Sequence, residues 1–441
     1  MAPNILEPLD AESPSGREGF SALLKRQFEI PEKIEASVQE IIKAVQTDGD
    51  SAVVEYTKKF DCPDFHLKMI QVDEKEIEAA YHEVDQKVVQ SLRRALSNIE
   101  MFHGKQMPVS WFDTREDGTI LGQIVSPVDA AGLYVPGGTG GSTPLVSSVL
   151  MNAVPARTAG VERLVLATPP GKDGKVNPYL LVAAKEAGVS EIYRMGSAWA
   201  IAAMAFGTQT IKPVDVIAGP GNIFVTVAKK LVSGAVGIDM IAGPSEILII
   251  ADETAEPSFV AADMLSQAEH DPMATAVLLS TSEKLAERVC SELTSQLEAL
   301  ERQDTARRSL ESNGLILVVA DLDTAAKMAN MVGPEHLELL VERPWDMIPK
   351  LRHAGAIFLG GFSPEPVGDY IAGPNHVLPT MGTARFSSAL GVETFLKRSS
   401  IISYSKEAFL EQAEDVMNLA RIEGLTAHER SVGIRLKANK E

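Results

Sequence analysis

The stretch "LSQAEHDP" (265–272) places a glutamine and a histidine where one helix face could present both to the same ion. Gln267 and His270 are three residues apart, and side chains at this spacing are neighbours on a helix. Imidazole is a common zinc ligand, and an amide oxygen is a rarer one. A polar helix end before Pro272 explains the same residues about three times as readily. The pair alone is therefore weak support for a metal site.

The stretch "GPEHLE" (333–338) sets Glu335 and His336 side by side just after a predicted helix. An adjacent carboxyl and imidazole supply two proton-transfer groups with different affinities. A solvated helix start, where the dipole favours glutamate, fits the same residues about equally well. Both interpretations stay open at this point.

The stretch "PEPVGDYIAGPNHVLPT" (364–380) is dense in glycine and proline and predicts a rigid irregular loop. It follows "GAIFLG", a predicted parallel strand, and loops at the carboxyl ends of such strands commonly carry binding groups. Asp369 could bind a metal, and His376 could bind a carboxylate or phosphate-like group. The alternative is that an aspartate and a histidine end two unrelated turns.

The charged tail contains a fourth stretch, "RIEGLTAHERS" (421–431), with Glu423 and His428 near a glycine break. Read alone, these two residues are typical of a solvated helix surface. The four stretches together nevertheless hold His270, His336, His376 and His428, which are four of the eight histidines.

Two glycine-bearing turns could admit a cofactor. Backbone amides of "YVPGGTGGSTP" (134–144) could cradle an anion, and "AGPGN" (218–222) follows a predicted strand and opens a helix. Neither turn matches GxGxxG, so the dinucleotide fingerprint is absent, and tight βα turns explain both. Ser245 and Glu246 stand where the predicted strand in "EILIIAD" (246–252) begins, Ser245 directly before it and Glu246 as the first residue of this stretch.

The surrounding pattern predicts the elements that must position these groups. Residues 31–60 and 73–106 carry apolar side chains at helical spacing, the first run being broken at "DGD". Beyond about residue 120, short apolar strands alternate with helices, which is typical of parallel sheets covered on both faces. There are too many such units for one mononucleotide-binding half, so two Rossmann-like α/β layers are expected. From about residue 395 the chain is predicted helical and charged.

Composition limits the possible partners and compartments. The chain has 441 residues, enough for two or three domains, and its formal net charge of −19 disfavours nucleic acid and anionic membranes. No apolar run approaches the ~20 residues of a membrane span, and the N-terminus does not resemble a secretion signal. Cys62 and Cys290 lie far apart in sequence, as expected for structural thiols in a reducing compartment. We expect a cytoplasmic protein.

The ordered series "GLYVPGG", "GPGN", "IDMIAGPSE", "LSQAEHDP", "PEHLE", "GDYIAGPNHVLPT", "ARFSSAL" and "EGLTAH" closely resembles the histidinol dehydrogenase family, over residues 30 to 435. The resemblance implies an α/β fold with two incomplete Rossmann-like parallel-sheet domains, a helical N-terminal region and a C-terminal helical tail. The implied division is 1–128, a helical region joining the first α/β domain; 129–244, the second Rossmann-like domain; 245–390, the rest of the first domain with the metal and acid–base residues; and 391–441, the tail.

The same resemblance implies an activity and roles for individual residues. The activity is the oxidation of L-histidinol to L-histidine through histidinal, with one Zn²⁺ per subunit and two NAD⁺, in a homodimer whose tails cross so that active sites are shared. The implied zinc ligands are Gln267, His270 and Asp369 of one subunit and His428 of the other subunit. The acid–base pair is Glu335 and His336. Substrate contacts come from Ser245, His376 and Glu423 together with the zinc ligands and His336, and cofactor contacts come from Tyr134 and Asn222.

Two departures from the family pattern fall in the cofactor region. "GSAWAIAA" places Trp199 where a cofactor-contacting glutamine is usual, and "GGTGGSTPL" is longer than in some members. Three other functions remain open: a related zinc and NAD⁺ dehydrogenase of another small polar alcohol such as a sulfopropanediol, a zinc hydrolase with Glu335 as base, and a catalytically silent metal-binding protein. The metal could be zinc or manganese.

Overall fold

The computed structural model describes residues 4–26, 30–137 and 144–438. Two compact units divide the chain. Residues 1–106 and 128–395 form the first, and residues 107–127 and 396–441 form the second. Within the described ranges no helix is long and apolar enough to cross a membrane.

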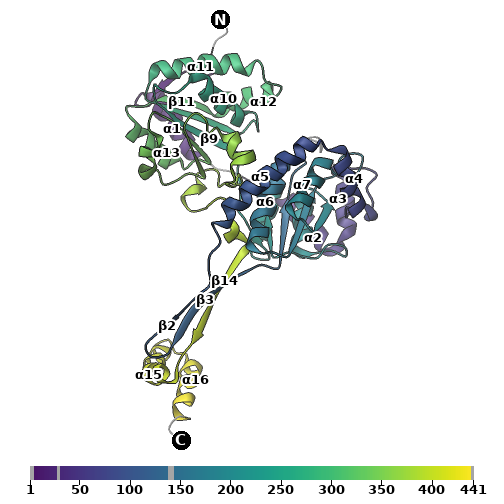
Figure 1. The fold of residues 1–441 in the computed structure, drawn as a ribbon, viewed down its shortest axis with the longest axis vertical. Helices are drawn as coiled ribbons and strands as arrows, with labels where there is room; N and C mark the ends of the chain where they lie inside the picture. The colour runs from purple at the N-terminus through teal and green to yellow at the C-terminus, as the bar shows by residue number, and fades with distance from the viewer. Residues whose placement is uncertain (1–3, 27–29, 138–143, 439–441) are drawn as a thin grey trace. The chain divides into compact units, whose positions relative to one another are not determined.

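A six-stranded parallel sheet, sheet A, forms one half of the first unit (Figure 1). Its strands in spatial order are β1 (Leu9–Asp10), β11 (Gly314–Val318), β10 (Thr275–Ser280), β9 (Glu246–Ala251), β12 (His336–Leu340) and β13 (Ala356–Leu359). One face packs on α10 (Pro257–Ala268), α11 (Glu283–Leu297) and α12 (Gln303–Asn313), and the other on α1 (Pro14–Lys25), α13 (Leu322–Val332) and η3 (Pro344–Lys350). Burial on both faces explains why β9, β10 and β12 are apolar throughout most of their length.

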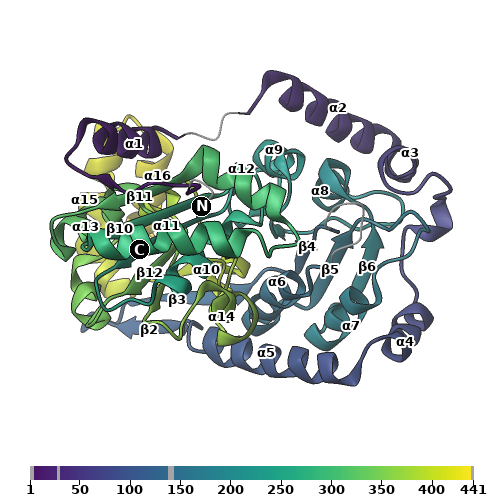
Figure 2. The same ribbon diagram turned by 90° about the horizontal axis from the view of Figure 1, so that it is seen from above.

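A five-stranded parallel sheet, sheet B, forms the other half of this unit (Figure 2). Its order is β6 (Glu191–Arg194), β5 (Arg163–Thr168), β4 (Ala130–Tyr134), β7 (Val216–Ala218) and β8 (Gly237–Ile238). On one face lie α2 (Glu32–Asp48), α3 (Asp50–Phe60), α8 (Ser197–Phe206) and α9 (Ile223–Val232), and on the other α4 (Glu74–Glu83), α5 (Gln86–Gly104), α6 (Val146–Ala159) and α7 (Pro178–Ala187). The two parallel sheets confirm the α/β class.

The predicted N-terminal helices are present, with the expected break between α2 and α3. Gly49 sits at that break with φ of +56°, a conformation that favours glycine. Residues 1–128, expected to join the first α/β domain, contain segments that pack on different parts of the structure, and residues 107–127 belong to the second unit. β1 and α1 join sheet A, whereas α2 to α5 pack on helices of sheet B because their apolar faces meet α6 to α9. The four-part division of the chain remains a proposal.

The second unit is an antiparallel sheet followed by two helices (Figure 1). Its elements are β2 (Trp111–Thr114), β3 (Ile120–Pro127), β14 (Leu396–Ser403), α15 (Lys406–Ile422) and α16 (Thr426–Lys437). The expectation that the tail is helical from about residue 395 is wrong for its first eight residues. All of β14 pairs with β3, from Leu396 opposite Pro127 to Ser403 opposite Ile120, and this long-range pairing overrides local preference.

The loop after β13 contains short helices. They are α14 (Glu365–Val367), the π-helix η4 (Gly368–Ala372), and two 3-10 turns, η5 (Thr383–Arg385) and η6 (Val392–Phe395). Two hydrogen bonds fix this loop against helices of sheet B: Asn98 Nδ2 donates to the Ile371 carbonyl (2.7 Å), and Asn375 Nδ2 donates to the Met151 carbonyl (2.6 Å).

Candidate functional site

The candidate metal and acid–base residues of the first unit meet at the amino edge of sheet A. Strands β9 and β12 are neighbours and begin at Glu246 and His336, and α10 runs back across the sheet so that Gln267 lies in its last turn. The expectation that Asp369 sits at the carboxyl end of a strand is wrong. After β13 the chain returns towards this edge through α14 and η4, which brings Asp369 beside His270.

Three of these side chains could hold a metal ion together. One ligand atom each from His270, Glu365 and Asp369 lies within 4.8 Å of the other two. Gln267 is 0% exposed, and its Nε2 has no hydrogen-bond partner among the residues described. Its Oε1 lies 3.0 Å from His336 Nδ1, which connects it to the acid–base pair. The set of imidazole, carboxylates and amide suits a divalent cation.

His336 has a defined proton arrangement. Its Nδ1 lies 3.0 Å from Gln267 Oε1 and 3.1 Å from the Glu246 carbonyl, with a carboxylate oxygen of Glu365 at 3.7 Å and of Glu335 at 3.8 Å. Because these neighbours are acceptors, we assign the proton to Nδ1, which leaves the lone pair on Nε2. Burial lowers the pKa of His336, so the ring is neutral and able to accept a proton.

Glu335 is held by a reciprocal pair of backbone contacts. Its Oε2 accepts a hydrogen bond from the Glu246 amide (2.9 Å), and Glu246 Oε1 accepts one from the Glu335 amide (3.2 Å). Arg26 forms an ion pair with Glu246. The idea that Glu335 and His336 form a solvated helix start is therefore wrong, since Glu335 is 5% exposed and His336 begins a buried strand.

Carboxyl groups accumulate here without enough positive charge to balance them. Burial raises the pKa of Glu335 well above its ordinary value, and the charges of Glu246, Glu365 and Asp369 raise it further. Burial also raises the pKa of Glu365 to about 8 and that of Asp369 to about 7. Buried carboxylates are stabilised by a nearby cation, so the electrostatics of this site fit a metal ion.

Glu365 is a residue of this group that was not predicted from the sequence. It stands four residues before Asp369 in the same short helical segment, so the two can share one face, and this spacing was the available signal. Its amide donates to Glu338 Oε1 (2.8 Å), which holds α14 against β12. Glu365 therefore belongs to the site as a further carboxylate next to His270.

The remaining predicted residues differ in what the structure says of them. His376 lies in the loop fixed by Asn375, and its Nε2 is buried with no partner in the described part of the chain. Ser245 directly precedes β9, and its carbonyl accepts from the Thr275 amide (3.0 Å). Glu423 and His428 belong to the second unit, at the end of α15 and on α16.

The predicted cofactor residues lie at the carboxyl edge of sheet B. Strand order reverses between β4 and β7, and such switch points are where α/β sheets bind ligands. Tyr134 ends β4, and its hydroxyl accepts from the Ser197 amide (3.0 Å). Asn222 follows β7 and caps α9 by accepting from the Phe224 and Val225 amides through Oδ1. Residues 138–143 of the other glycine-bearing turn lie outside the described residues.

A buried ion pair holds the turn between β7 and α9. Lys229 Nζ pairs with Asp239 and donates to the Gly219 carbonyl (3.0 Å), while Asp239 Oδ2 accepts from the Gly219 amide (2.8 Å). Gly219 has φ of +121°, and a Cβ there would lie 2.1 Å from the Tyr134 carbonyl oxygen. The pair therefore fixes the backbone between Tyr134 and Asn222.

Trp199 is buried in the core of sheet B. Its indole Nε1 donates to Thr57 Oγ1 (3.1 Å), and its ring stacks on Tyr56 and Phe60 at centroid distances of 5.8 and 5.6 Å. This tryptophan thus joins α8 to α3 in the core of sheet B.

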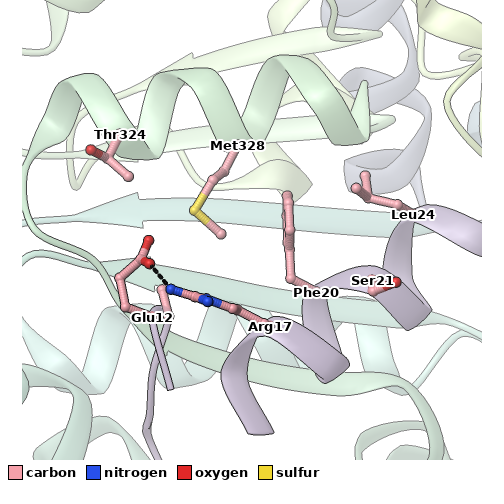
Figure 3. A pocket seen from close by; sticks show the side chains of 8 residues that line it. Glu12, Arg17, Phe20, Ser21, Leu24, Thr324 and Met328 are labelled. Atoms are coloured by element: carbon pink, nitrogen blue, oxygen red, sulfur yellow. Dashed lines mark hydrogen bonds and ion pairs between the residues drawn. The ribbon is translucent and has the colours of Figure 1, made fainter. Parts of the chain in front are cut away.

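A hollow of about 280 Å³ lies apart from these residues, between α1 and α13 (Figure 3). An ion pair of Glu12 and Arg17 (2.6 Å) lines it, together with Ala11, Phe20, Ser21, Leu24, Thr324 and Met328. None of its lining residues is a candidate site residue, so the site is recognised from its side chains and not from this cavity.

Comparison with known proteins identifies the family. The family profile described as histidinol dehydrogenase matches residues 24–436. A histidinol dehydrogenase from Desulfotalea psychrophila is 57% identical over 434 residues, covering 98% of this chain and 100% of the relative. One from Bacillus subtilis is 53% identical, covering 96% of this chain and 97% of the relative.

A solved structure agrees with this assignment. The crystal structure of histidinol dehydrogenase from Elizabethkingia anophelis matches with a TM-score of 0.93 at 36% identity, covering 100% of both chains. The profile, the relatives and the shared fold together lead to one conclusion: the chain belongs to the histidinol dehydrogenase family.

Proposed function

We propose that the protein oxidises L-histidinol to L-histidine through histidinal, using one divalent metal ion per subunit, preferably zinc, and two NAD⁺ per turnover. Family membership makes it an NAD-dependent oxidoreductase of histidine biosynthesis. The observation that carries the finer proposal is the buried Glu335–His336 pair together with His270, Glu365 and Asp369, which lie close enough to one another to hold a metal ion. A proton acceptor can take the hydroxyl proton during an alcohol oxidation, and a neighbouring cation site can orient the substrate for it.

Gln267, His270 and Asp369, with His428 supplied by a second copy, would hold the metal in this proposal. When bound, the ion would orient the amine and imidazole of histidinol and stabilise the ionised forms of the surrounding carboxyls. Ser245, His376 and Glu423 would contact the substrate, and Tyr134 and Asn222 the cofactor.

His336 Nε2 would act as the base of the first oxidation. It would remove the hydroxyl proton of histidinol while a hydride leaves the same carbinol carbon for the first NAD⁺, giving histidinal and NADH. The Nδ1 proton, directed at Gln267 and the Glu246 carbonyl, would stabilise the resulting imidazolium.

Glu335 would assist the second oxidation. In its ionised form it would take a proton from the water that adds to the aldehyde, and the hydrated aldehyde would then lose a hydride to the second NAD⁺ and become the carboxylate. The sum is one histidinol, one water and two NAD⁺ giving one histidine carboxylate, two NADH and three protons. Retention of the reactive aldehyde within one site is the physical reason to carry out both steps there.

The second unit supports a shared dimeric site. Its helices expose large apolar side chains, most strongly Ile422 (83%) and Ile434 (66%), and no residue of α16 is buried. An apolar helical surface of this kind is stabilised by packing on another chain. We therefore keep the proposal that the tail crosses to a second copy and brings His428 to its metal site.

Two variants test the assignment of the acid–base pair. His336→Asn should slow both oxidations while the metal content of the protein stays that of the wild type. Glu335→Gln should slow the oxidation of added histidinal more than that of histidinol in single-turnover measurements. Near-normal turnover by His336→Asn would remove the base assignment, and equal losses of the two steps in Glu335→Gln would remove the water-activating role.

A further inference from the structure

Asp61 lies at the end of α3, and its side chain lies at the carboxyl edge of sheet B. It follows the last residue of α3, and a Cβ placed on Gly196 would lie 3.3 Å from Asp61 Oδ2 and 2.9 Å from Pro169 Cβ. Pro169 directly follows β5, and Gly196 caps the start of α8 just after β6. The carboxylate therefore lies next to the ends of two adjacent parallel strands.

Two polar atoms at this edge are buried and unpaired. Asp61 Oδ2 and Thr168 Oγ1 have no hydrogen-bond partner among the described residues, although Thr168 is 0% exposed. Tyr134, at the end of the neighbouring strand β4, accepts from Ser197 and keeps its hydroxyl hydrogen available. Unpaired buried polar atoms are rare in native proteins, and a bound ligand is a common reason for them.

The chemistry of these atoms selects a class of ligand. A carboxylate oxygen only accepts, so its partner must be a donor such as a sugar hydroxyl. In the strand order of sheet B, β5 is the second strand of a doubly wound unit that begins with β4. In dinucleotide-binding folds an acidic side chain near the end of the second strand binds the adenosine ribose, and this analogy points to the same ring here.

We infer that Asp61 binds the 2′-hydroxyl of the adenosine ribose of NAD⁺ and thereby selects NAD⁺ over NADP⁺. This inference rests on the proposed use of NAD⁺. The 2′-phosphate of NADP⁺ would place two negative groups side by side in a partly desolvated position, which disfavours binding. Asp61 is thus a specificity-determining residue for the cofactor and takes no part in proton transfer.

The test measures binding by titration calorimetry with the metal-loaded, full-length protein and three probes: NAD⁺, its 2′-deoxyadenosine analogue, and NADP⁺. The wild type should bind NAD⁺ at least about tenfold more tightly than the deoxy analogue, the ratio expected for one charge-assisted hydrogen bond. In Asp61→Asn, the affinity for NAD⁺ should exceed that for the deoxy analogue by about threefold or less. The ratio of the affinities for NAD⁺ and NADP⁺ should fall by about tenfold in the same variant. Asp64→Asn, an exposed aspartate three residues on, removes the same charge and should retain both ratios of the wild type.

Several outcomes would overturn the inference. If the wild type binds NAD⁺ and the deoxy analogue with equal affinity, the inference is wrong. This outcome needs no variant, so it tests the inference even if Asp61→Asn does not fold. Wild-type ratios in Asp61→Asn, or in Asp61→Ser as a second substitution, would overturn the inference as well. If the wild type binds no NAD⁺ at all, the proposed function is wrong. If it binds NAD⁺ but does not prefer it over the deoxy analogue, only the assignment of Asp61 is wrong.

Discussion

The buried ion pair of Lys229 and Asp239 should be essential for the order of the cofactor turn. The side chains are 4% and 0% exposed, so Lys229→Met leaves a carboxylate in a site with almost no water. Breaking a buried pair in this way costs about 3–5 kcal/mol. Asp239 keeps hydrogen bonds from the Gly219 and Met240 amides, so we expect the lower end, about 3 kcal/mol. The double variant Lys229→Met/Asp239→Asn removes both charges and keeps a side-chain oxygen that accepts from the Gly219 amide. It should therefore lower the local stability by only about 1 kcal/mol.

Hydrogen–deuterium exchange of peptides spanning residues 214–240 measures this cost locally, which is preferable to global unfolding in a protein of several domains. A loss of about 3 kcal/mol should speed exchange about a hundredfold in Lys229→Met. Lys230→Met is the matched control, because Lys230 is 45% exposed and pairs with Glu35 only at 3.6 Å. Unchanged protection in Lys229→Met, or equal losses in the single and double variants, would refute this reasoning.

Three further predictions follow from the site. Mixing His336→Asn with His428→Asn subunits should restore about a quarter of wild-type turnover, since half of randomly paired dimers gain one intact shared site; no restoration would mean that each tail serves its own chain. Glu365→Gln should weaken zinc binding about tenfold in competition with a chromophoric chelator, by loss of a carboxylate beside the ligands; an unchanged affinity would place Glu365 outside the metal site. Asp263 is a buried residue of α10 whose side chain is hydrogen-bonded to Glu338; Asp263→Asn should raise the melting temperature at pH 8, with the gain shrinking below pH 6. Burial raises the pKa of Asp263 to about 6, so the native protein loses stability as pH rises through that value; equal gains at all pH values would contradict this.

The fold class could be predicted from the sequence because its strands are buried on both faces. Apolar runs such as 246–251 and 275–280 alternate with helices, and each became a strand of a parallel sheet. Strand β14 could not be predicted locally, since its partner β3 lies more than 260 residues away in sequence. The same limit applied to residues 1–128, whose apolar helix faces do not say which sheet they cover.

The candidate site was predicted in its parts and not in its geometry. Gln267 with His270, and Glu335 with His336, are local pairs, so spacing alone could suggest them. Their meeting at the amino edge of sheet A depends on α10 running back across β9 and on the loop after β13 turning back, and both are tertiary features. Glu365 was overlooked because its four-residue spacing from Asp369 is informative only once both residues are known to lie in one helical segment, and this stretch was predicted to be an irregular loop.

The most direct test of the account follows NADH and histidine together while the metal is removed and restored. With L-histidinol and excess NAD⁺, the protein should form two NADH for each histidine. Turnover should fall with bound metal during chelation and return when zinc or manganese is added back, whichever ion the site prefers. Histidine formed without NADH, or turnover that persists after metal analysis shows the protein to be metal-free, would contradict a metal-assisted double oxidation at this site.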